Sequence, residues 1–261
     1  MDALLEMKGI TKRFGGLTAV DQVDLIVKKG EILGLIGPNG AGKTTFFNIL
    51  TGIYRPDQGN IQFNGTDITG FKPYQIANQG IFRTFQNIRL LKDYSVLDNI
   101  KLGLFRQTKA GAWSSIFGLR RSREEEKKVA EESWALLERL GLTDLANEAA
   151  GNLSYGNQRR VEIARALVSH PEMILLDEPA AGMNSEEVES LSALVRQIRQ
   201  QGTTVILIEH NVGMVVELCD RLVVLDHGVK IADGDPNQVV ANPAVIEAYI
   251  GGQEVTEVVG D

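Results

Sequence analysis

The stretch EILGLIGPNGAGKTTFFNIL, residues 31–50, decides the fold. Its apolar beginning predicts a strand buried on both faces, and TTFFNIL predicts an apolar helix. The glycine-rich loop between them, Gly37 to Thr44, matches the pattern G-x-x-x-x-G-K-[ST] in the strand–loop–helix context that this pattern requires. Its glycines allow the backbone to wrap a phosphate chain, with successive N–H groups pointing inward. The stretch therefore predicts a nucleotide-binding α/β protein.

The residues of this loop have separate predicted tasks. Contacts to the phosphates of ATP are expected from one continuous run, Gly37, Pro38, Asn39, Gly40, Ala41, Gly42, Lys43, Thr44 and Thr45. Lys43 is expected to reach the β- and γ-phosphates. Thr44 is expected to give its hydroxyl to Mg²⁺, because this hard cation takes oxygen ligands.

A second apolar run ends in two acids. MILLDEP, residues 173–179, predicts a buried strand followed by Asp177 and Glu178. An ATPase with this loop needs an acidic partner for Mg²⁺ at the end of a buried strand, and Asp177 supplies it. Glu178 is placed to accept a proton from an attacking water. Without the loop, the same pair would indicate only a turn in which Pro179 ends the strand.

Further apolar runs bounded by turn residues predict the rest of the sheet structure. The predicted strands are residues 3–10, 23–30, 31–37, 59–65, 81–85, 173–177, 203–209 and 221–228. Helical patterns lie between the later runs and favour parallel strands, whereas the set near the N-terminus is expected to be more antiparallel.

Residues 90–150 change in composition to helix formers and charge. Within LRRSREEEKKVAEESWALLERLGL, the apolar residues Val129, Trp134, Leu137 and Leu140 recur near helical spacing, and the charged residues form a solvated face. The predicted fold class is α/β, with a P-loop NTPase core, a mostly parallel central sheet, an N-terminal antiparallel β subdomain and an inserted α-helical subdomain. We predict one domain over residues 1–261, with the core and β subdomain in 1–89 and 151–261 and the helical subdomain in 90–150.

Net charge, cysteine content and the length of the apolar runs limit the classes of protein to which the chain can belong. The formal net charge of -7 over 261 residues disfavours a nucleic-acid partner, because phosphate affinity needs clustered Lys and Arg. The single cysteine, Cys219, excludes an intrachain disulfide and fits a reducing compartment. Neither a signal peptide nor an apolar run of about 18 residues is visible, so we predict a cytosolic protein that can still sit on a membrane through a partner.

LSYGNQRR, residues 153–160, predicts a tight turn that runs into a helix. The unpaired N–H groups at such a helix start, with the hydroxyl of Ser154 and the backbone of Gly156, are suited to holding an anion. The alternative is an ordinary helix cap by Ser154. The turn cannot easily serve its own chain's nucleotide, because the loop, Asp177 and Glu178 already surround one face of it.

Several motifs, in their order along the chain, resemble those of the nucleotide-binding subunit of an ATP-binding cassette (ABC) transporter. KRFGG resembles the adenine-stacking loop, RTFQN the loop whose glutamine touches Mg²⁺ and the transmembrane partner, and LSYGNQ the family signature. MILLDE resembles the second Walker motif, AAGMN the dimer-contact loop, and IEHN the segment of the switch histidine. The resemblance covers essentially the whole chain.

The resemblance implies a role for each matching side chain. Phe14 would stack on the base with Val20 beside it, Thr44, Gln86 and Asp177 would hold Mg²⁺, and the catalytic set would be Glu178, His210, Gln86 and Lys43. Ser154 and Gly156 would cap the γ-phosphate on a partner subunit. Tyr155, Asn157 and Asn184 depart from the usual glycine, glutamine and aspartate, but none of these changes removes a catalytic group.

The residues themselves give independent support to these roles. His210 follows the apolar run VILI, which places its imidazole at the carboxyl end of a central strand, and Gln86 likewise follows IFRTF. A Phe14 ring stacked on a base would contact only the face of the base. Selectivity for purines would therefore be weak. The alternatives are a structural histidine at 210 and a core aromatic at 14.

The combination of RFGGLTAV, FRTFQNIRL, PAAGMN and the polar insertion around WSSIFGLRRSREEEKK most resembles the ATPases of branched-chain (hydrophobic) amino-acid importers. This implies a pair of ATPase subunits, as a homodimer or heterodimer, below two transmembrane permease subunits that an external solute-binding protein feeds. The chain would then be a peripheral protein at the cytoplasmic face of the inner (plasma) membrane.

Other functions stay open at this point. Related importers of urea or short amides have similar ATPases, so the solute is not fixed. A soluble ABC ATPase acting on DNA or ribosomes usually has a long coiled-coil insertion or two fused cassettes, and neither fits this length with one phosphate loop. A P-loop kinase of small metabolites would leave LSYGNQ and IEHN unexplained.

Overall fold

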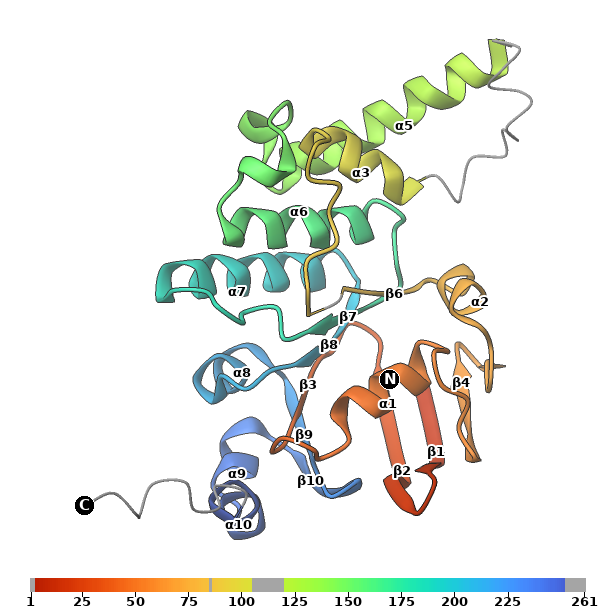
Figure 1. Ribbon diagram of the computed structural model, residues 1–261, viewed down its shortest axis with the longest axis vertical. Coiled ribbons are helices and arrows are strands. Elements are labelled where there is room, and N and C mark those ends of the chain that lie inside the picture. The colour runs from red at the N-terminus through yellow and green to blue at the C-terminus, as the bar shows by residue number, and fades with distance from the viewer. Residues whose placement is uncertain (1–2, 85, 105–119, 252–261) are drawn as a thin grey trace.

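The computed structural model describes residues 3–84, 86–104 and 120–251, and the strands of this part of the chain form two sheets (Figure 1). The first sheet has the order β2-β1-β4-β5 and the second the order β10-β9-β3-β8-β7-β6. The strands are β1 (Ala3–Phe14), β2 (Leu17–Lys28), β3 (Ile32–Ile36), β4 (Gln58–Phe63), β5 (Thr66–Asp67), β6 (Ile81–Arg83), β7 (Met173–Asp177), β8 (Thr204–Ile208), β9 (Arg221–Asp226) and β10 (Val229–Gly234).

Helices pack against the second sheet and, at one end of the molecule, against one another. They are α1 (Lys43–Leu50), α2 (Pro73–Asn78), α3 (Val96–Leu104), α5 (Arg120–Arg139), α6 (Tyr155–Leu167), α7 (Ser185–Gln200), α8 (Val212–Leu218), α9 (Pro236–Val240) and α10 (Pro243–Gly251), with short 3-10 helices at Thr143–Leu145 and Ala150–Asn152. In Figure 1, α3, α5 and α6 lie at one end of the molecule, and β1, β2 and β4 lie toward the other.

The second sheet is parallel except at one edge. The pairs β3–β8, β3–β9, β7–β8 and β6–β7 are parallel, and β10 pairs antiparallel with β9. In the first sheet, β1 pairs antiparallel with β2 and β4, and β4 pairs antiparallel with β5. The predicted fold class is therefore confirmed, and β5 and the edge strand β10 are elements that the apolar patterns did not indicate.

The central strands are buried on both faces, as their continuous apolar runs predict. Every residue of β3, β7 and β8 is buried. Along β7, Met173 and Leu175 pack with α1 and the first sheet, whereas Ile174 and Leu176 pack with the helices of the opposite face. This alternation follows from the two-residue period of a strand.

The helices between β6 and β7 differ in one detail from the sequence prediction. On α5 the buried positions are Ser133, Leu136 and Leu137, followed by Leu140, while Trp134 is 44% exposed. The prediction that Trp134 faces the core is therefore wrong, because a turn of about 100° per residue carries it beyond the edge of this stripe. The polar insertion around WSSIFGLRRSREEEKK lies partly outside the described residues, and the boundaries 90 and 150 stay a prediction.

Candidate functional site

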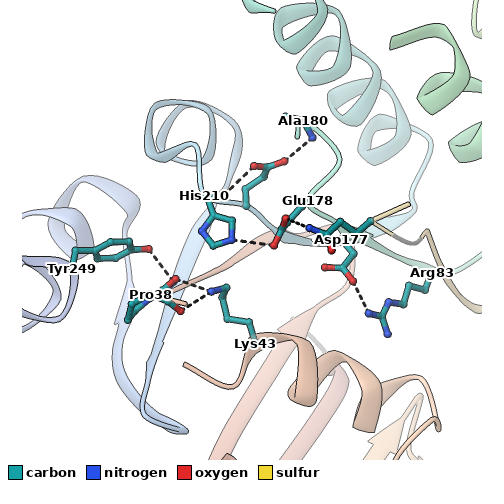
Figure 2. A network of polar contacts seen from close by, with 11 residues as sticks. Pro38, Lys43, Arg83, Asp177, Glu178, Ala180, His210 and Tyr249 are labelled. Carbon is teal, nitrogen blue, oxygen red and sulfur yellow. Dashed lines mark hydrogen bonds and ion pairs between the residues drawn. The ribbon is translucent and has the colours of Figure 1, made fainter. Parts of the chain in front are cut away.

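The carboxyl ends of the parallel strands gather the predicted site residues at one edge of the sheet (Figure 2). The phosphate loop follows β3, Asp177 ends β7, and His210 lies just beyond β8. Because β8 lies between β3 and β7, these groups come from neighbouring strands although they are far apart in the sequence. This edge is where open α/β sheets bind their ligands.

The phosphate loop is braced by backbone packed against its glycines. A Cβ at Gly37 would lie 2.0 Å from the carbonyl oxygen of Leu225, and one at Gly42 would lie 2.3 Å from that of Ala19. Both glycines also have positive φ angles, 147° and 98°. No side chain caps the start of α1, so its first N–H groups remain directed at the loop, where an anion would satisfy them.

Lys43 is folded against its own loop. Its Nζ donates to the carbonyl oxygens of Gly37 at 2.7 Å and Pro38 at 2.9 Å, and the residue is only 6% exposed. Burial lowers the pKa of Lys43, and the nearby carboxylates of Glu178 and Asp177 act in the opposite direction. A phosphate chain in the loop would offer this cation a stronger set of acceptors than neutral carbonyls.

Glu178 stands between Gln86 and His210. Its Oε2 accepts from Nε2 of Gln86 at 2.7 Å, and its Oε1 lies 3.0 Å from Nε2 of His210. The backbone of Glu178 has a φ of 46°, a left-handed conformation that is rare for this residue type. Its N–H donates to Ile208 at the end of β8, which fixes this conformation. Strained backbone of this kind is typical of functional positions.

Asp177 has a partner that the sequence analysis did not predict. Arg83, at the end of β6, donates from Nη2 to Oδ2 of Asp177 at 2.5 Å, and the two side chains are 7% and 8% exposed. The same guanidinium donates to Oδ1 of Asn48 at 2.7 Å and lies over the ring of Phe47. The charge of the predicted Mg²⁺ ligand is therefore neutralised by a nearly buried ion pair.

Glu209, directly before His210, is a buried acid that ties two strand ends together. Its Oε1 accepts from the backbone N–H of Ala180 at 2.7 Å, and its Oε2 accepts from that of His210 at 3.1 Å. Burial raises the pKa of Glu209, while these N–H groups favour the charged form. Because Ala180 follows Glu178 closely, the contact holds the segments of Glu178 and His210 in register.

The oxygen donors at this edge fit Mg²⁺. Thr44 is exposed at the start of α1, Gln86 is exposed beside Glu178, and Asp177 ends β7. A hydroxyl, an amide oxygen and a carboxylate are ligands that Mg²⁺ accepts while it keeps several waters. Within residues 3–84, 86–104 and 120–251 no group of three or more His, Cys, Asp and Glu could hold a metal ion.

Comparison with known proteins identifies the family to which the chain belongs. The family model described as "ABC transporter" matches residues 20–181, and one described as "Branched-chain amino acid ATP-binding cassette transporter" matches residues 229–255. The chain is an ATPase of the ABC transporter family. The predicted resemblance is thereby confirmed.

Individual relatives agree with this family along nearly the whole chain. The ABC ATPase is 43% identical over 249 residues to the high-affinity branched-chain amino acid transport ATP-binding protein BraF of Pseudomonas aeruginosa, covering 95% of this chain and 98% of that one. The values for LivG of Escherichia coli, which carries the same description, are identical. A solved ATP-binding cassette of an ABC transporter in its ADP conformation superposes with a TM-score of 0.85 at 36% identity, covering 96% of this chain and all of that one.

The predicted base-stacking residues of this ABC ATPase differ in accessibility. Phe14, at the end of β1, is 42% exposed and meets the ring of Tyr54 edge-on at 5.2 Å, so it is not a core aromatic. Val20 on β2 is fully buried within the core beneath the phosphate loop. The alternation along β2 turns the Val20 side chain inward, and its place beside the base stays a prediction.

Ser154 and Gly156 lie at the start of α6, where Ser154 contacts its own helix and Gly156 packs against α7. Ser154 caps the helix, accepting from the N–H of Asn157 at 3.3 Å, so the alternative of an ordinary N-cap also holds. Gly156 is buried against α7, where a Cβ would lie 2.7 Å from Oε1 of Glu187. Asn184 caps α7 by accepting from the N–H of Glu187, which explains why asparagine serves there as well as aspartate.

Tyr249 is a further residue that sequence reasoning missed. From α10, its hydroxyl accepts from the N–H of Gly37 at 2.9 Å, as Figure 2 shows. Burial raises the pKa of this hydroxyl. A tyrosine in a mostly apolar helix near the C-terminus gives no signal that it reaches a loop more than two hundred positions earlier. The end of the ABC ATPase domain thus braces the beginning of its phosphate loop.

Proposed function

We propose that ATP binds with its base on Phe14 and its phosphates in the loop from Gly37 to Thr45, and that Glu178 is the general base for hydrolysis. The support is the convergence of Lys43, Asp177, Glu178 and His210 at one sheet edge. Lys43 would exchange the carbonyls of Gly37 and Pro38 for the β- and γ-phosphate oxygens. This exchange keeps the cation paired throughout.

Glu178 would take a proton from the attacking water at one of its carboxylate oxygens. Its contacts with Gln86 and His210 place that carboxylate between two groups able to hold water or the γ-phosphate in line. Thr44, Gln86 and Asp177 would hold Mg²⁺, which when bound neutralises charge on the β- and γ-phosphates. Arg83 keeps Asp177 oriented toward the same edge.

The start of α6 would serve the nucleotide of a second ATPase subunit. Ser154 lies on the outside of the molecule at a helix N-terminus, and the site of its own chain is built from β3, β6, β7 and β8. N–H groups and helix dipole at such a position favour an anion. ATP held between two copies, or between this chain and a homologous subunit, would therefore close the pair.

The variant Ser154→Arg tests this pairing. ATP affinity of the monomer should stay near normal, because the serine lies apart from its own loop. Association driven by nucleotide, measured by sedimentation, should be lost, together with hydrolysis at the partner's site. Ser190→Arg places the same side chain on an exposed serine of α7 and should retain both. Loss of ATP binding by the Ser154→Arg monomer would instead show that the turn serves its own site.

A groove near the glutamine loop is our candidate contact for the permease subunits. A cavity of about 320 Å³ is lined by Phe82, Arg83, Thr84, Arg89, Leu102, Gly103, Glu162, Arg165 and Ala166. Leu91 and Tyr94, which follow the lining residue Arg89 in the sequence, are 44% and 56% exposed. None of the helices in the described part of the chain is long and apolar enough to cross a membrane. We infer a peripheral position at the cytoplasmic face, with permeases providing the passage.

We infer that the solute is a branched-chain or other hydrophobic amino acid. The observation that carries this is the similarity to BraF and LivG, together with the match of residues 229–255. Uptake of labelled leucine, and separately of urea, should be measured in cells lacking the chain. The unaltered chain should restore leucine uptake and Glu178→Gln should not. Restoration of urea uptake alone, or of neither, would overturn the assignment.

A further inference from the structure

Three side chains of α6 hold the backbone of residues 86–89, which we call the glutamine segment. Nη2 of Arg159 donates to the carbonyl oxygen of Gln86 at 2.6 Å. Oε1 of Glu162 accepts from the N–H of Arg89 at 3.2 Å, and Nη1 of Arg165 donates to the carbonyl oxygen of Arg89 at 2.5 Å. Because these residues recur every third position, they lie along one face of the helix.

Two of the three side chains that hold the glutamine segment also form a buried ion pair with each other. Nη1 of Arg159 lies 2.7 Å from Oε2 of Glu162, and the two side chains are 0% and 2% exposed. The guanidinium also donates to the hydroxyl of Tyr155 at 3.2 Å, in the first turn of α6. Both members of the pair belong to α6, and each also bonds the backbone of the glutamine segment. A movement of the segment away from the helix would therefore take hydrogen bonds from two buried charges, which opposes independent movement.

The two ends of this assembly face different nucleotides. Gln86 contacts Glu178 in the chain's own site. At the other end, Ser154 and Gly156 begin the helix that the proposed function assigns to the nucleotide of the partner subunit. We call residues 153–158 the signature turn. If Gln86 shifts when MgATP binds, its contact with the Arg159 guanidinium would therefore displace the signature turn as well.

We propose that Arg159 and Glu162 are positioning residues that transmit nucleotide occupancy from the glutamine segment to the signature turn within one subunit. This proposal rests on the proposed function for the role of the signature turn. The transmission itself is intramolecular and can be measured without a partner.

The test is hydrogen exchange on the full chain carrying Glu178→Gln, at concentrations where sedimentation shows a monomer. MgATP should change the exchange of amides in both the glutamine segment and the signature turn by about fivefold or more, the worth of one hydrogen bond. In Arg159→Lys the change in the glutamine segment should persist and that in the signature turn should be lost. Lysine keeps the charge but lacks the planar fork that reaches Gln86, Glu162 and Tyr155 together.

Arg160→Lys is the matched control. Arg160 lies one position further along α6 and donates to the carbonyl oxygen of Leu140, not to the glutamine segment. It should show both exchange responses. Glu162→Gln gives a second variant if Arg159→Lys does not fold, and it should also lose the response of the signature turn.

Two results would overturn the relay. One is a signature turn that still responds to MgATP in Arg159→Lys, even if its exchange without nucleotide is faster, since the pair would then only stabilise the helix. The other is loss of the response in Arg160→Lys as well. Failure of the unaltered chain to associate with ATP would contradict the proposed pairing instead and leave the monomer measurement valid.

Discussion

Replacing Arg83 by methionine should destabilise the protein through Asp177. The pair is nearly buried, with side chains 7% and 8% exposed, and methionine fills similar space without charge. Removing one partner of a buried ion pair costs about 3–5 kcal/mol, because the other charge is left uncompensated. For a chain of this size each kcal/mol lowers Tm by about 2–4 °C, so the expected loss is about 6–20 °C.

Calorimetry on the unaltered protein and on four variants checks this reasoning: Arg83→Met, Asp177→Asn, the two combined, and Arg196→Met. Arg83→Met/Asp177→Asn should recover most of the loss, because the second change removes the stranded charge. Arg196→Met breaks an exposed pair with Glu217 and should cost less than about 1 kcal/mol. MgADP should raise the Tm of Arg83→Met more than that of the unaltered protein, since a cation near Asp177 would replace the missing guanidinium. A Tm of Arg83→Met within about 2 °C of that of the unaltered protein would refute the claim that Asp177 is left as an uncompensated charge. The same claim fails if the loss of stability in the double variant equals the sum of the losses in the two single variants.

Four further variants probe the site and its outer surface. Glu178→Gln keeps the side-chain length, so ATP affinity should persist while turnover falls about 10²–10⁴-fold and the ATP-bound pair accumulates on a sizing column; near-normal hydrolysis would contradict a general base here. Lys43→Ala should weaken ATP binding about 10- to 100-fold in a direct titration, the worth of hydrogen bonds to a charged group, whereas Lys29→Ala should not. Leu91→Asp and Tyr94→Asp should reduce uptake while the free chain hydrolyses ATP normally, and equal loss of both activities in each variant would count against a permease contact.

The sequence predicts those parts of the fold that are determined by residues close together in the chain. The loop from Gly37 to Thr44 specifies its strand, turn and helix within twenty residues, and the runs of β7 and β8 are apolar on both faces as the structure has them. Trp134 shows the limit of this reasoning, because its apolar character matches a helical stripe that its angular position does not.

The contacts that complete the site join positions too far apart for any pattern to reveal. Arg83 and Asp177 are separated by 94 positions, and the link exists only because β6 and β7 are neighbours. Glu209 had a weak signal, an acid at the end of a buried strand, but its acceptance of N–H groups from Ala180 and His210 depends on how β7 and β8 align. Such partners follow from topology, which the sequence specifies only through the whole fold.

Each reacting group in this structure already has a protein partner. Lys43 donates to two loop carbonyls, Asp177 is paired with Arg83, and Glu178 is held by Gln86 and His210. Nucleotide and metal would therefore enter by exchanging one set of contacts for another, without first having to desolvate bare charges. The free energy of ATP binding is then the difference between the contacts made to bound nucleotide and metal and the protein contacts that they replace. The measured affinity is therefore lower than the contacts in the bound state alone would give. It follows that removing a resting partner that does not itself contact nucleotide or metal, such as Arg83 beside Asp177, should tighten nucleotide binding.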